Sequence, residues 1–260
     1  MKKHIADWTV KENLSLHTNY CLLKLTSDKP LPEILPGQFV QVRVDGAQNI
    51  FLRRPISVHY VDEKAQELWL LIQKVGEGTR KLADLQVNTR INLIYPLGNT
   101  FTIPDLPNPH KKLLLIGGGV GIAPLLYLGK CLKDKGFTPT FILGARSEKD
   151  LLQLDEFSKL GTVHITTENG HLGEKGYVTN HSILQSGKVD FIYTCGPKPM
   201  MVSVAKYATK WNIPCEVSLE NTMACGIGAC LCCVEKTQKG NTCVCTEGPI
   251  FNIKELTWQI

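Results

Sequence analysis

Four cysteines near the C-terminus constrain the fold of this chain more than any other feature. Three of them, Cys225, Cys230 and Cys233, follow the pattern C-x4-C-x2-C, and a fourth follows further along. This is the plant-type spacing of a 2Fe–2S centre, whose irons are held by thiolates. The segment must bend to aim several sulfurs at one place, and Gly226 and Gly228 permit tight bends because glycine has no Cβ. Because such a centre carries one electron at a time, the spacing predicts an electron-transfer protein.

Neighbouring thiols leave the ligand set open. Cys232 competes with Cys233, although only Cys233 keeps the x2 spacing, and either Cys243 or Cys245 could supply the fourth sulfur. Zinc is one alternative, but structural zinc sites usually pair their ligands in two short units, whereas here three cysteines share one loop. Disulfides are another, but the N-terminal residues lack the apolar core of a signal peptide.

The composition narrows the class of protein. The chain has 260 residues, a net charge of +5 and an ordinary apolar fraction of 43%, which together indicate one large or two modest globular domains. Its lysines are scattered rather than interleaved with aromatics, so we expect no nucleic-acid binding. The apolar stretch 113–128 is broken by glycines and a proline and is too short to span a membrane. The many reduced thiols predict a cytoplasmic protein.

The first hundred residues have the pattern of β-structure. Residues 38–44 place Val40, Val42 and Val44 on one face and Gln41 and Arg43 on the other, so we expect a half-buried strand. Short strands separated by Pro and Gly turns predict a small antiparallel barrel, with one or two helical turns at 79–85. Further strand candidates are residues 20–26, 52–60, 67–75 and 90–94.

A second pattern follows, in which short apolar runs alternate with helical stretches. This alternation predicts a parallel sheet covered on both faces. The expected strands are residues 112–116, 139–145, 163–167, 190–195 and 215–219, and the expected helices are 122–135, 148–159, 177–185 and 198–211. The chain is therefore predicted to be a multi-domain α+β protein with a barrel at 1–100, an α/β dinucleotide domain at 101–219 and a cysteine-rich 2Fe–2S unit at 220–260.

A glycine loop lies between the first of these strands and its helix. Gly117, Gly118, Gly119 and Gly121 would let the backbone approach a pyrophosphate, and the following helix N-terminus offers free N–H groups. The spacing is not G-x-G-x-x-G, so a tight turn without a ligand stays open as an alternative.

A second turn, Cys195-Gly196-Pro197, ends another predicted parallel strand. Ligands of open α/β sheets bind beyond the carboxyl ends of the strands, so Cys195 could face the reacting part of a dinucleotide and act in catalysis. A buried cysteine before an ordinary turn is the alternative.

An arginine pair marks the predicted barrel strand. Arg53 and Arg54 could bind phosphate through paired N–H donors, or could be solvated. Ser57 lies three residues beyond Arg54, so the two share a strand face only if the strand twists or bulges near Pro55. Further on, Gly76-Glu77-Gly78-Thr79 could offer N–H groups to a second phosphate oxygen, or form a turn capped by Thr79.

Taken in order, these motifs resemble the ferredoxin–NADP reductase superfamily. R-P-I-S is similar to its flavin motif R-x-[YF]-[ST], with Ile56 where an aromatic is usual. Across nearly the whole chain the motifs resemble, more narrowly, the electron-transfer subunits of type B dihydroorotate dehydrogenases. The resemblance rests on L-R-R-P-I-S, V-G-E-G-T, G-G-G-V-G-I-A-P-L, C-G-P-K-P-M-M and M-A-C-G-I-G-A-C followed by C-x-x-G-P-I-F. In that family the cysteine before x-x-G-P is the fourth cluster ligand, which implies Cys245.

The resemblance also implies how the cofactors are held. Arg54 would contact FAD phosphate and Ser57 the isoalloxazine ring. Further residues that it implies along FAD are Pro55, Ile56, Ile72, Gln73 and Lys74, with Gly78 and Thr79 at its pyrophosphate. The dinucleotide would be NAD, although Arg146 could accept the 2′-phosphate of NADP and Glu148 could hold ribose hydroxyls.

The resemblance finally implies a partner. The partner would be an FMN-containing subunit that oxidises dihydroorotate, in a heterotetramer with two copies of each chain. Nicotinamide accepts two electrons together as a hydride whereas an iron–sulfur centre passes one, so FAD belongs between them because a flavin does both. Other FAD and 2Fe–2S subunits, such as those of NADH-dependent ferredoxin:NADP reductases or sulfide dehydrogenases, are the alternative.

Overall fold

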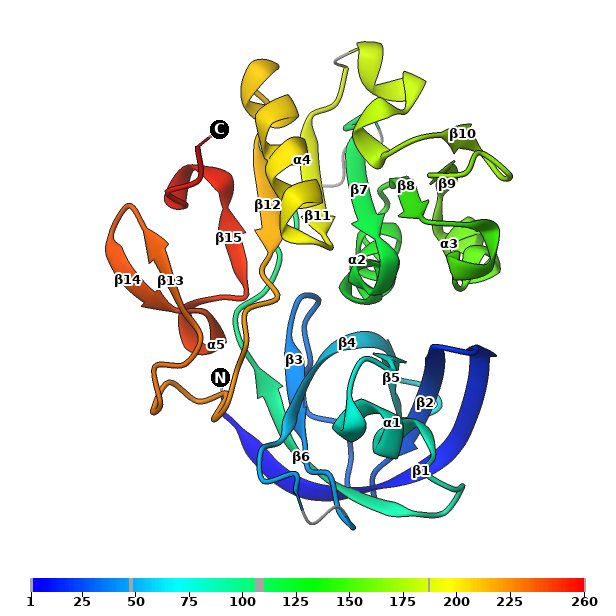
Figure 1. The fold of residues 1–260 in the computed structure, drawn as a ribbon, viewed down its shortest axis with the longest axis vertical. Coiled ribbons are helices and arrows are strands. Elements are labelled where there is room, and N and C mark those ends of the chain that lie inside the picture. The colour runs from blue at the N-terminus through cyan, green and yellow to red at the C-terminus, as the bar shows by residue number, and fades with distance from the viewer. Residues whose placement is uncertain (1, 47–48, 106–109, 187, 260) are drawn as a thin grey trace. The chain divides into compact units, whose positions relative to one another are not determined.

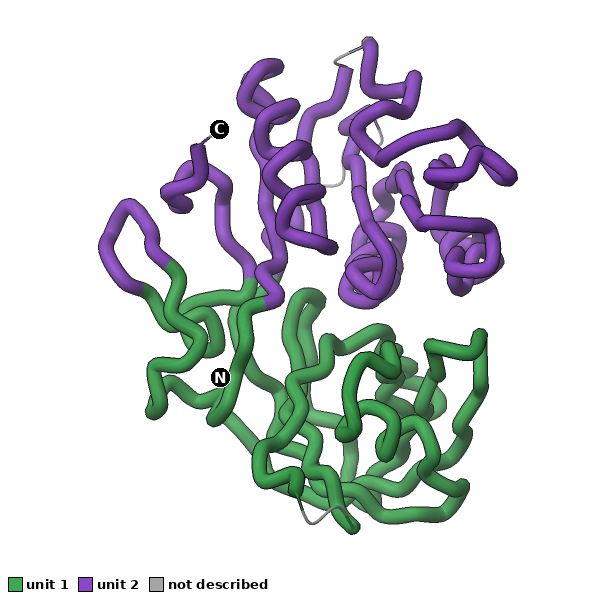
Figure 2. Tube along the Cα trace, viewed as in Figure 1, with its two compact units in different colours: residues 1–100, 221–235, 242–249 green, residues 101–220, 236–241, 250–260 purple. Residues whose placement is uncertain are grey.

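The computed structural model describes residues 2–46, 49–105, 110–186 and 188–259. Its contacts divide the chain into two compact units, drawn in different colours in Figure 2. The barrel unit comprises residues 1–100, 221–235 and 242–249, and the sheet unit comprises residues 101–220, 236–241 and 250–260. The C-terminal segment is therefore shared between two units, whereas the sequence predicted one separate unit at 220–260.

The barrel unit contains a closed barrel with the strand order β1-β2-β5-β4-β3-β6, in which every pair is antiparallel (Figure 1). This confirms the predicted N-terminal antiparallel barrel, although β1 was not predicted. Its elements are β1 (His4–His17), β2 (Tyr20–Thr26), β3 (Phe39–Val42), β4 (Arg54–Asp62), β5 (Glu67–Gln73), α1 (Glu77–Ala83) and β6 (Arg90–Leu97).

Large apolar side chains fill the barrel. Trp8 on β1 is fully buried and packs edge-on against Tyr95 of β6, with ring centroids 5.0 Å apart. Leu25 and Leu68 are directly paired across β2 and β5 and are both fully buried. Each such side chain stabilises the fold by about 1.5–3 kcal/mol relative to exposure. Because the barrel is closed, every strand is hydrogen-bonded on both sides. The strands therefore hold the side chains at the ends of the barrel in fixed positions.

Strand β3 differs from its predicted half-buried pattern. Val40 and Val42 are fully buried as expected, but Gln41 on the opposite face is also fully buried. The prediction was wrong there because the cysteine-bearing segment, from the far end of the chain, packs over that face at Gly226.

The sheet unit contains a seven-stranded sheet with the order β10-β9-β8-β7-β11-β12-β15. All neighbours are parallel except β15, which pairs antiparallel with β12. This confirms the predicted parallel-sheet domain and adds an antiparallel edge strand. The strands are β7 (Leu113–Gly118), β8 (Thr140–Ala145), β9 (Thr162–Thr167), β10 (Glu174–Lys175), β11 (Phe191–Cys195), β12 (Cys215–Ser218) and β15 (Ile250–Asn252).

The chain reverses its direction of travel across this sheet between β7 and β11. From β7 it moves outward to β8 and β9, then returns to β11 and moves the other way to β12. Because crossovers between parallel strands are right-handed, α2 and α4 cover opposite faces. The helices are α2 (Ala123–Asp134), α3 (Leu154–Leu160) and α4 (Lys198–Lys210), with 3-10 turns η1 (Gly119–Ile122), η2 (Glu148–Asp150), η3 (Val178–Asn180), η4 (Ser182–Ser186) and η5 (Ile253–Glu255).

Two of the predicted helices are confirmed closely and two are not. Helix α2 starts with Pro124 in its first turn and buries Leu125, Leu128 and Leu132 on one stripe, as its sequence predicts. The predicted helix at 148–159 is split into η2 and α3, with Gln153 in the left-handed region between them. The predicted helix at 177–185 is wrong, because only the 3-10 turns η3 and η4 form there, separated by extended backbone at His181.

The cysteine-bearing segment, residues 221–249, has little regular structure. It contains the hairpin of β13 (Val234–Thr237) and β14 (Gly240–Cys243), followed by the single turn α5 (Val244–Glu247). The side chain of Thr237 accepts from Lys239 N and donates to Gly240 O, which closes the hairpin turn.

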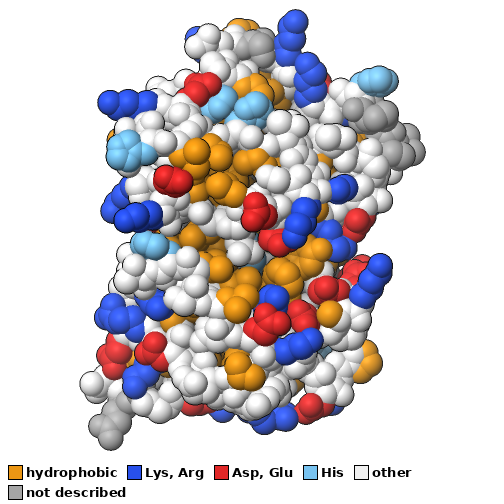
Figure 3. Space-filling view, turned by 90° about the vertical axis from the view of Figure 1, so that its right-hand side faces the viewer, with side chains coloured by type: hydrophobic (Ala, Val, Ile, Leu, Met, Phe, Trp, Pro, Cys, Tyr) orange, Lys and Arg blue, Asp and Glu red, His pale blue; other side chains and the backbone are white. Residues whose placement is uncertain are grey.

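The surface carries both signs of charge. On the face drawn in Figure 3, Lys and Arg side chains lie among Asp and Glu side chains rather than in a single basic stripe. In the described part of the chain, we find no helix with the length and apolarity needed to cross a membrane.

Candidate functional site

Backbone N–H groups are aimed at four cysteine sulfurs in the cysteine-bearing segment. Cys225 N donates to the sulfur of Cys230 at 3.5 Å, and Ile227 N donates to the sulfur of Cys225 at 3.5 Å. Gly228 N donates to the sulfur of Cys245 at 3.2 Å, and the sulfur of Cys233 accepts from Cys245 N at 3.4 Å. The four sulfurs that receive a donor are the four predicted ligands. Such hydrogen bonds stabilise thiolate charge, the form in which cysteine binds iron.

The two spare thiols differ from these four. Among the described residues, no backbone N–H donates to the sulfur of Cys232 or Cys243. Cys232 is exposed and follows Leu231, whereas its neighbour Cys233 is only 2% exposed. None of the ten cysteines, all of which lie in the described residues, forms a disulfide.

Local surroundings set the protonation of two of these thiols in opposite directions. The N–H of Ile227 lowers the pKa of Cys225 to about 6, since it favours the thiolate. Burial raises the pKa of Cys245 to about 12, because the apolar surroundings disfavour charge. A bound cation that neutralises the thiolates would offset this second cost.

The four sulfurs are not gathered on one point. Within the described residues, no three His, Cys, Asp or Glu side chains converge as ligands of a single metal ion. A 2Fe–2S centre divides its four cysteines between two irons, so it requires two pairs of sulfurs rather than one focus. The hydrogen bonds link Cys225 with Cys230 and Cys233 with Cys245, which is such an arrangement.

The cysteine-bearing segment packs tightly on the barrel. Gly226 has φ +70°, and a Cβ there would lie 2.6 Å from Cγ and Nε2 of Gln41. At the other end of the segment, a Cβ on Gly98 would lie 2.6 Å from Pro249, and Asn99 N donates to Gly248 O at 2.6 Å. The sulfurs are therefore held against the same unit that carries the predicted flavin motif.

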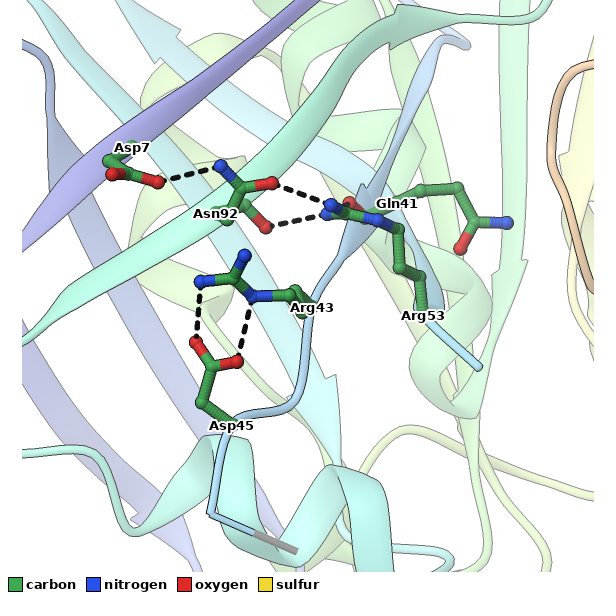
Figure 4. A network of polar contacts seen from close by, with 6 residues as sticks. All are labelled: Asp7, Gln41, Arg43, Asp45, Arg53 and Asn92. Atoms are coloured by element: carbon green, nitrogen blue, oxygen red, sulfur yellow. Dashed lines mark hydrogen bonds and ion pairs between the residues drawn. The ribbon is translucent and has the colours of Figure 1, made fainter. Parts of the chain in front are cut away.

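The two arginines of that motif have different surroundings. Arg53 donates to the backbone oxygens of Gln41 and Asn92 and to the side chain of Asn92, which itself donates to Asp7 (Figure 4). These bonds occupy its guanidinium within the barrel. Arg54 donates to Leu52 O at 2.8 Å, and its side chain lies over Gly78, where a Cβ would come within 2.5 Å of Nε.

Thr79 has an internal partner for its hydroxyl. Its Oγ1 accepts from Val75 N at 3.0 Å and Gly76 N at 3.1 Å, so it caps the start of α1 from the third helical position. Only the backbone N–H groups of Gly78 and Thr79 are then offered to a phosphate. The structure thus supports the capping role of Thr79, with Gly76 rather than Thr79 as the N-cap residue.

The remaining predicted flavin residues lie on β4 and near the end of β5. Arg54 to Ser57 pair regularly with β3, and the bulge in β4 falls later, between Val58 and Tyr60. Arg54 and Ser57 therefore lie on opposite faces of the strand, because the ladder has no bulge near Pro55 that would bring them to one face. Pro55 and Ile56 are half-buried on this stretch.

On β5, the side chain of Ile72 is fully buried in the barrel, so only its backbone can lie along a ligand. The side chain of Gln73 donates to Tyr20 Oη at 3.1 Å, and Lys74 N donates to Asn19 O.

In the sheet unit, the two glycine motifs meet at the carboxyl ends of β7 and β11. A Cβ on Gly121 would lie 2.4 Å from Cα of Gly196 and 2.5 Å from the oxygen of Cys195. A Cβ on Gly118 would lie 2.4 Å from the sulfur of Met200, and Gly117 packs on Ile122. Gly119 has φ +56° and open space around it. The strands that carry these motifs are the pair where the chain reverses direction, which is where open α/β sheets bind ligands.

Cys195 ends β11 as a fully buried thiol. Burial raises its pKa well above the usual range, so it remains protonated. Its Sγ donates to a carboxylate oxygen of Glu220 at 3.8 Å. A neutral thiol in this position can donate a hydrogen bond but is not an activated nucleophile. Pro197 is exposed directly beyond it and precedes α4.

The surroundings of two residues were not found from the sequence. Arg53 was treated as one of an interchangeable arginine pair, and only the barrel closure shows that it binds backbone oxygens. Gln41 was placed on an exposed face by its alternation, and no local signal could have shown that a glycine loop covers it.

Comparison with protein families identifies two domains. Residues 220–257 match the iron–sulfur cluster binding domain of dihydroorotate dehydrogenase B, and residues 115–206 match the oxidoreductase NAD-binding domain. The first match spans all six cysteines between Cys225 and Cys245 and favours iron–sulfur over zinc. The second spans the glycine loop and the turn at Cys195.

Solved structures with a similar fold include reductases. A structure described as the NADH-dependent reduced ferredoxin-NADP oxidoreductase of flavin-based electron bifurcation has a TM-score of 0.85 and 28% identity, covering 97% of this chain and 90% of that one. A ferredoxin reductase in carbazole 1,9a-dioxygenase has a TM-score of 0.70 at 20% identity, covering 82% of this chain and 68% of that one, and shares the fold.

Curated relatives agree with one another in name. A protein of Shouchella clausii is 38% identical over 85% of this chain and 86% of its own length, and one of Bacillus velezensis is 36% identical over 98% and 99%. Both are named dihydroorotate dehydrogenase B (NAD(+)), electron transfer subunit. With its iron–sulfur and NAD-binding domains, this chain belongs to the family of electron transfer subunits of dihydroorotate dehydrogenase B.

Proposed function

We propose that this chain passes electrons from dihydroorotate oxidation, through a 2Fe–2S cluster and FAD, to NAD. An electron transfer subunit works with a catalytic subunit, and we assign to that partner FMN and the dihydroorotate site. The expected complex holds two copies of each chain and acts in pyrimidine biosynthesis in the cytoplasm. Membership of the family supports this assignment.

The observation that carries the proposal is the set of N–H donors to Cys225, Cys230, Cys233 and Cys245. These four cysteines would hold the cluster, with Cys225 and Cys230 on one iron and the other two on the second. The cluster would supply one-electron transfer, and the protein would set its potential through hydrogen bonds to sulfur and through burial. The N–H donors support Cys233 over Cys232, as the x2 spacing does, and Cys245 over Cys243, as the family resemblance does.

FAD would lie along the rim of the barrel at β4 and β5. Arg54 would pair with a phosphate oxygen, because its guanidinium lies over Gly78 beside the N-terminus of α1. The N–H groups of Gly78 and Thr79 would hold the pyrophosphate, and Ser57 would reach the isoalloxazine ring. The remaining contacts come from Pro55, Ile56, Gln73 and Lys74 and from the backbone of Ile72.

NAD would bind at the carboxyl ends of β7 and β11. Gly117, Gly118, Gly119 and Gly121 would bring the backbone to the pyrophosphate, and Gly196 and Pro197 would leave room for the nicotinamide half. Cys195 would lie beside the reacting ring as a neutral thiol whose proton is donated to Glu220. The dinucleotide would be NAD rather than NADP, as in the names of the relatives.

This assignment proposes three functional regions. Residues 1–100 would bind FAD, residues 101–219 would bind NAD and residues 220–260 would bind the cluster. The last region is divided by its contacts between the barrel unit and the sheet unit, so it would work as a shared element rather than as an independent domain.

The ligand set is tested by serine substitution. Cys225→Ser, Cys230→Ser, Cys233→Ser and Cys245→Ser should each lose most of the iron and acid-labile sulfide measured after anaerobic purification. Cys232→Ser and Cys243→Ser are matched controls from the same segment and should keep both. Loss of iron from the controls, or full iron in any of the four, would overturn the ligand set.

One observation favours a second function within the same class. The structure with a TM-score of 0.85 is described as a ferredoxin-NADP oxidoreductase, and the similarity covers 97% of this chain. Co-purification decides between them. An FMN-containing partner that oxidises dihydroorotate supports the first function, and a partner that couples NADH to ferredoxin and NADP supports the second.

A further inference from the structure

Gln41 carries a buried amide without any partner. The residue is 0% exposed, and neither Nε2 nor Oε1 makes a hydrogen bond within the described structure. Leaving one buried polar group unsatisfied is costly, and native structures do so rarely. An amide with both atoms orphaned therefore indicates a partner that the polypeptide itself does not supply.

The Gln41 amide lies against the loop that carries two of the cluster ligands. A Cβ added at Gly226 would lie 2.6 Å from Nε2, so the amide contacts the backbone between Cys225 and Ile227. Gly226 has φ +70°, and only glycine combines that conformation with so close an approach. The sulfur of Cys225 accepts the next N–H of the same loop, from Ile227.

The backbone of Gln41 is fixed, so the amide cannot swing away to solvent. Gln41 pairs with Pro55 on β4 and with Ile94 on β6. Its backbone oxygen accepts from Arg53 Nη1 at 3.3 Å, and its side chain points away from that network in Figure 4. One residue thus joins the strand of the flavin motif to the loop of the cluster ligands.

The cysteine sulfurs already have donors. Each of the four proposed ligands accepts a backbone N–H. A 2Fe–2S centre adds two bridging sulfides and is anionic overall, so it presents further sulfur acceptors that attract an N–H and repel an amide oxygen.

We propose that the Nε2–H of Gln41 donates a hydrogen bond to a sulfur of the 2Fe–2S cluster and raises its reduction potential. The inference rests on the proposed function, since it requires the cluster. The added negative charge of the reduced cluster would strengthen this bond, so the Gln41 donor would favour the reduced form over the oxidised one. The amide keeps its proton throughout, so no co-reactant is consumed.

The test is a redox titration of the purified chain with EPR detection of the reduced cluster. Gln41→Met keeps the side-chain volume and removes the donor. At a fixed ambient potential we expect about tenfold less reduced relative to oxidised cluster, which corresponds to a potential lower by about 59 mV for one electron. Iron content should stay at the wild-type level.

The matched control is Gln38→Met. Gln38 directly precedes β3 and is also buried, but its amide is satisfied. Its Oε1 accepts from Leu35 N, and its Nε2 donates to Gly98 O. This variant should leave the potential unchanged. An unchanged potential in Gln41→Met with iron retained, or an equal shift in Gln38→Met, would overturn the inference.

If the Gln41→Met variant does not hold iron, a measurement on the wild-type chain still tests the proposal. With glutamine labelled by ¹⁵N in its side chain, pulsed EPR of the reduced cluster should show a nitrogen coupling that persists in Gln38→Met. Absence of that coupling refutes the role of Gln41. A wild-type chain that contains no cluster at all refutes the proposed function instead, so the two failures are distinguishable.

Discussion

At Gly121 the glycine loop touches the backbone of the turn after β11. Alanine there would place a Cβ 2.4 Å from Cα of Gly196, and backbone cannot yield as a flexible side chain would. We expect Gly121→Ala to lower the free energy of unfolding by about 1–3 kcal/mol, the usual cost of overpacking. NADH-dependent dye reduction should fall with it, because the two motifs would be forced apart.

Urea unfolding and dye-reduction assays check this expectation. The control is Gly76→Ala, since Gly76 has extended backbone and nothing within 4 Å of an added Cβ. Its unfolding free energy should fall by less than about 1 kcal/mol, because alanine is only a poorer N-cap than glycine and meets no steric obstacle. Equal stability of the two variants would show that the two motifs do not meet as described.

Glu216 gives the sheet unit a pH-dependent stability. Burial raises the pKa of its carboxyl above the usual range, even though Thr102 donates to both carboxylate oxygens. A raised pKa in the folded state means that stability present below the unfolded pKa is lost as the pH rises through the folded pKa. Glu216→Gln cannot ionise and escapes that loss.

The unfolding free energy of Glu216→Gln relative to wild type should therefore rise with pH and then level off. Between the unfolded and folded pKa values the slope is up to about 1.4 kcal/mol per pH unit. Urea unfolding of both proteins across the acid to neutral range measures it. A difference that is constant or falls with pH contradicts the burial of this carboxyl.

Single residues were predictable where a spacing or motif carried the chemistry. The x2 spacing selected Cys233 over Cys232, and the structure gives only Cys233 an N–H donor. Cys245 was selected over Cys243 by family resemblance alone. Gln41 could not be predicted, because its burial depends on a loop from the other end of the chain.

Strand β1 closes the barrel, although its sequence carries no clear strand pattern. Only two of its 14 residues, Trp8 and Val10, are buried, so the strand lacks a continuous apolar pattern. Trp8 nevertheless fills the barrel beside Tyr95. We expect Trp8→Ala to lower the free energy of unfolding by about 3–5 kcal/mol, as large aromatic deletions from cores do.

Ile5→Ala is the matched control on the same strand, because Ile5 is 70% exposed. It should change the unfolding free energy by no more than about 0.5 kcal/mol. Denaturant unfolding of both variants provides the comparison. A small effect of Trp8→Ala would mean that β1 does not close the barrel.

Elements with strong local signals were predicted well, and those that depend on tertiary contacts were not. Strand β2 coincides with its prediction, and α2 and α4 fall within one or two residues of theirs. Residues 177–185 look helical by composition, but the first turn ends at His181, whose backbone is extended. Strand β15 is too short to predict, and it forms because β12 offers it a free edge.

At the scale of the whole molecule, the sequence predicted a barrel followed by a parallel sheet, and both are confirmed. The division at 100/101 coincides with the boundary between the two units. The C-terminal segment was harder to predict, since its cysteines lie with the barrel while β15 completes the sheet. Such sharing arises from pairing between distant residues, which a local pattern does not record.

We propose that the cysteines of this chain hold a 2Fe–2S cluster on the electron route between the partner subunit and FAD. The most direct measurement is freeze-quench EPR of the complex mixed with dihydroorotate. We predict that the reduced-cluster signal appears first and decays when NAD is added, at the rate at which NADH forms. NADH formation with no cluster signal, at an undiminished rate in Cys233→Ser, would contradict the account.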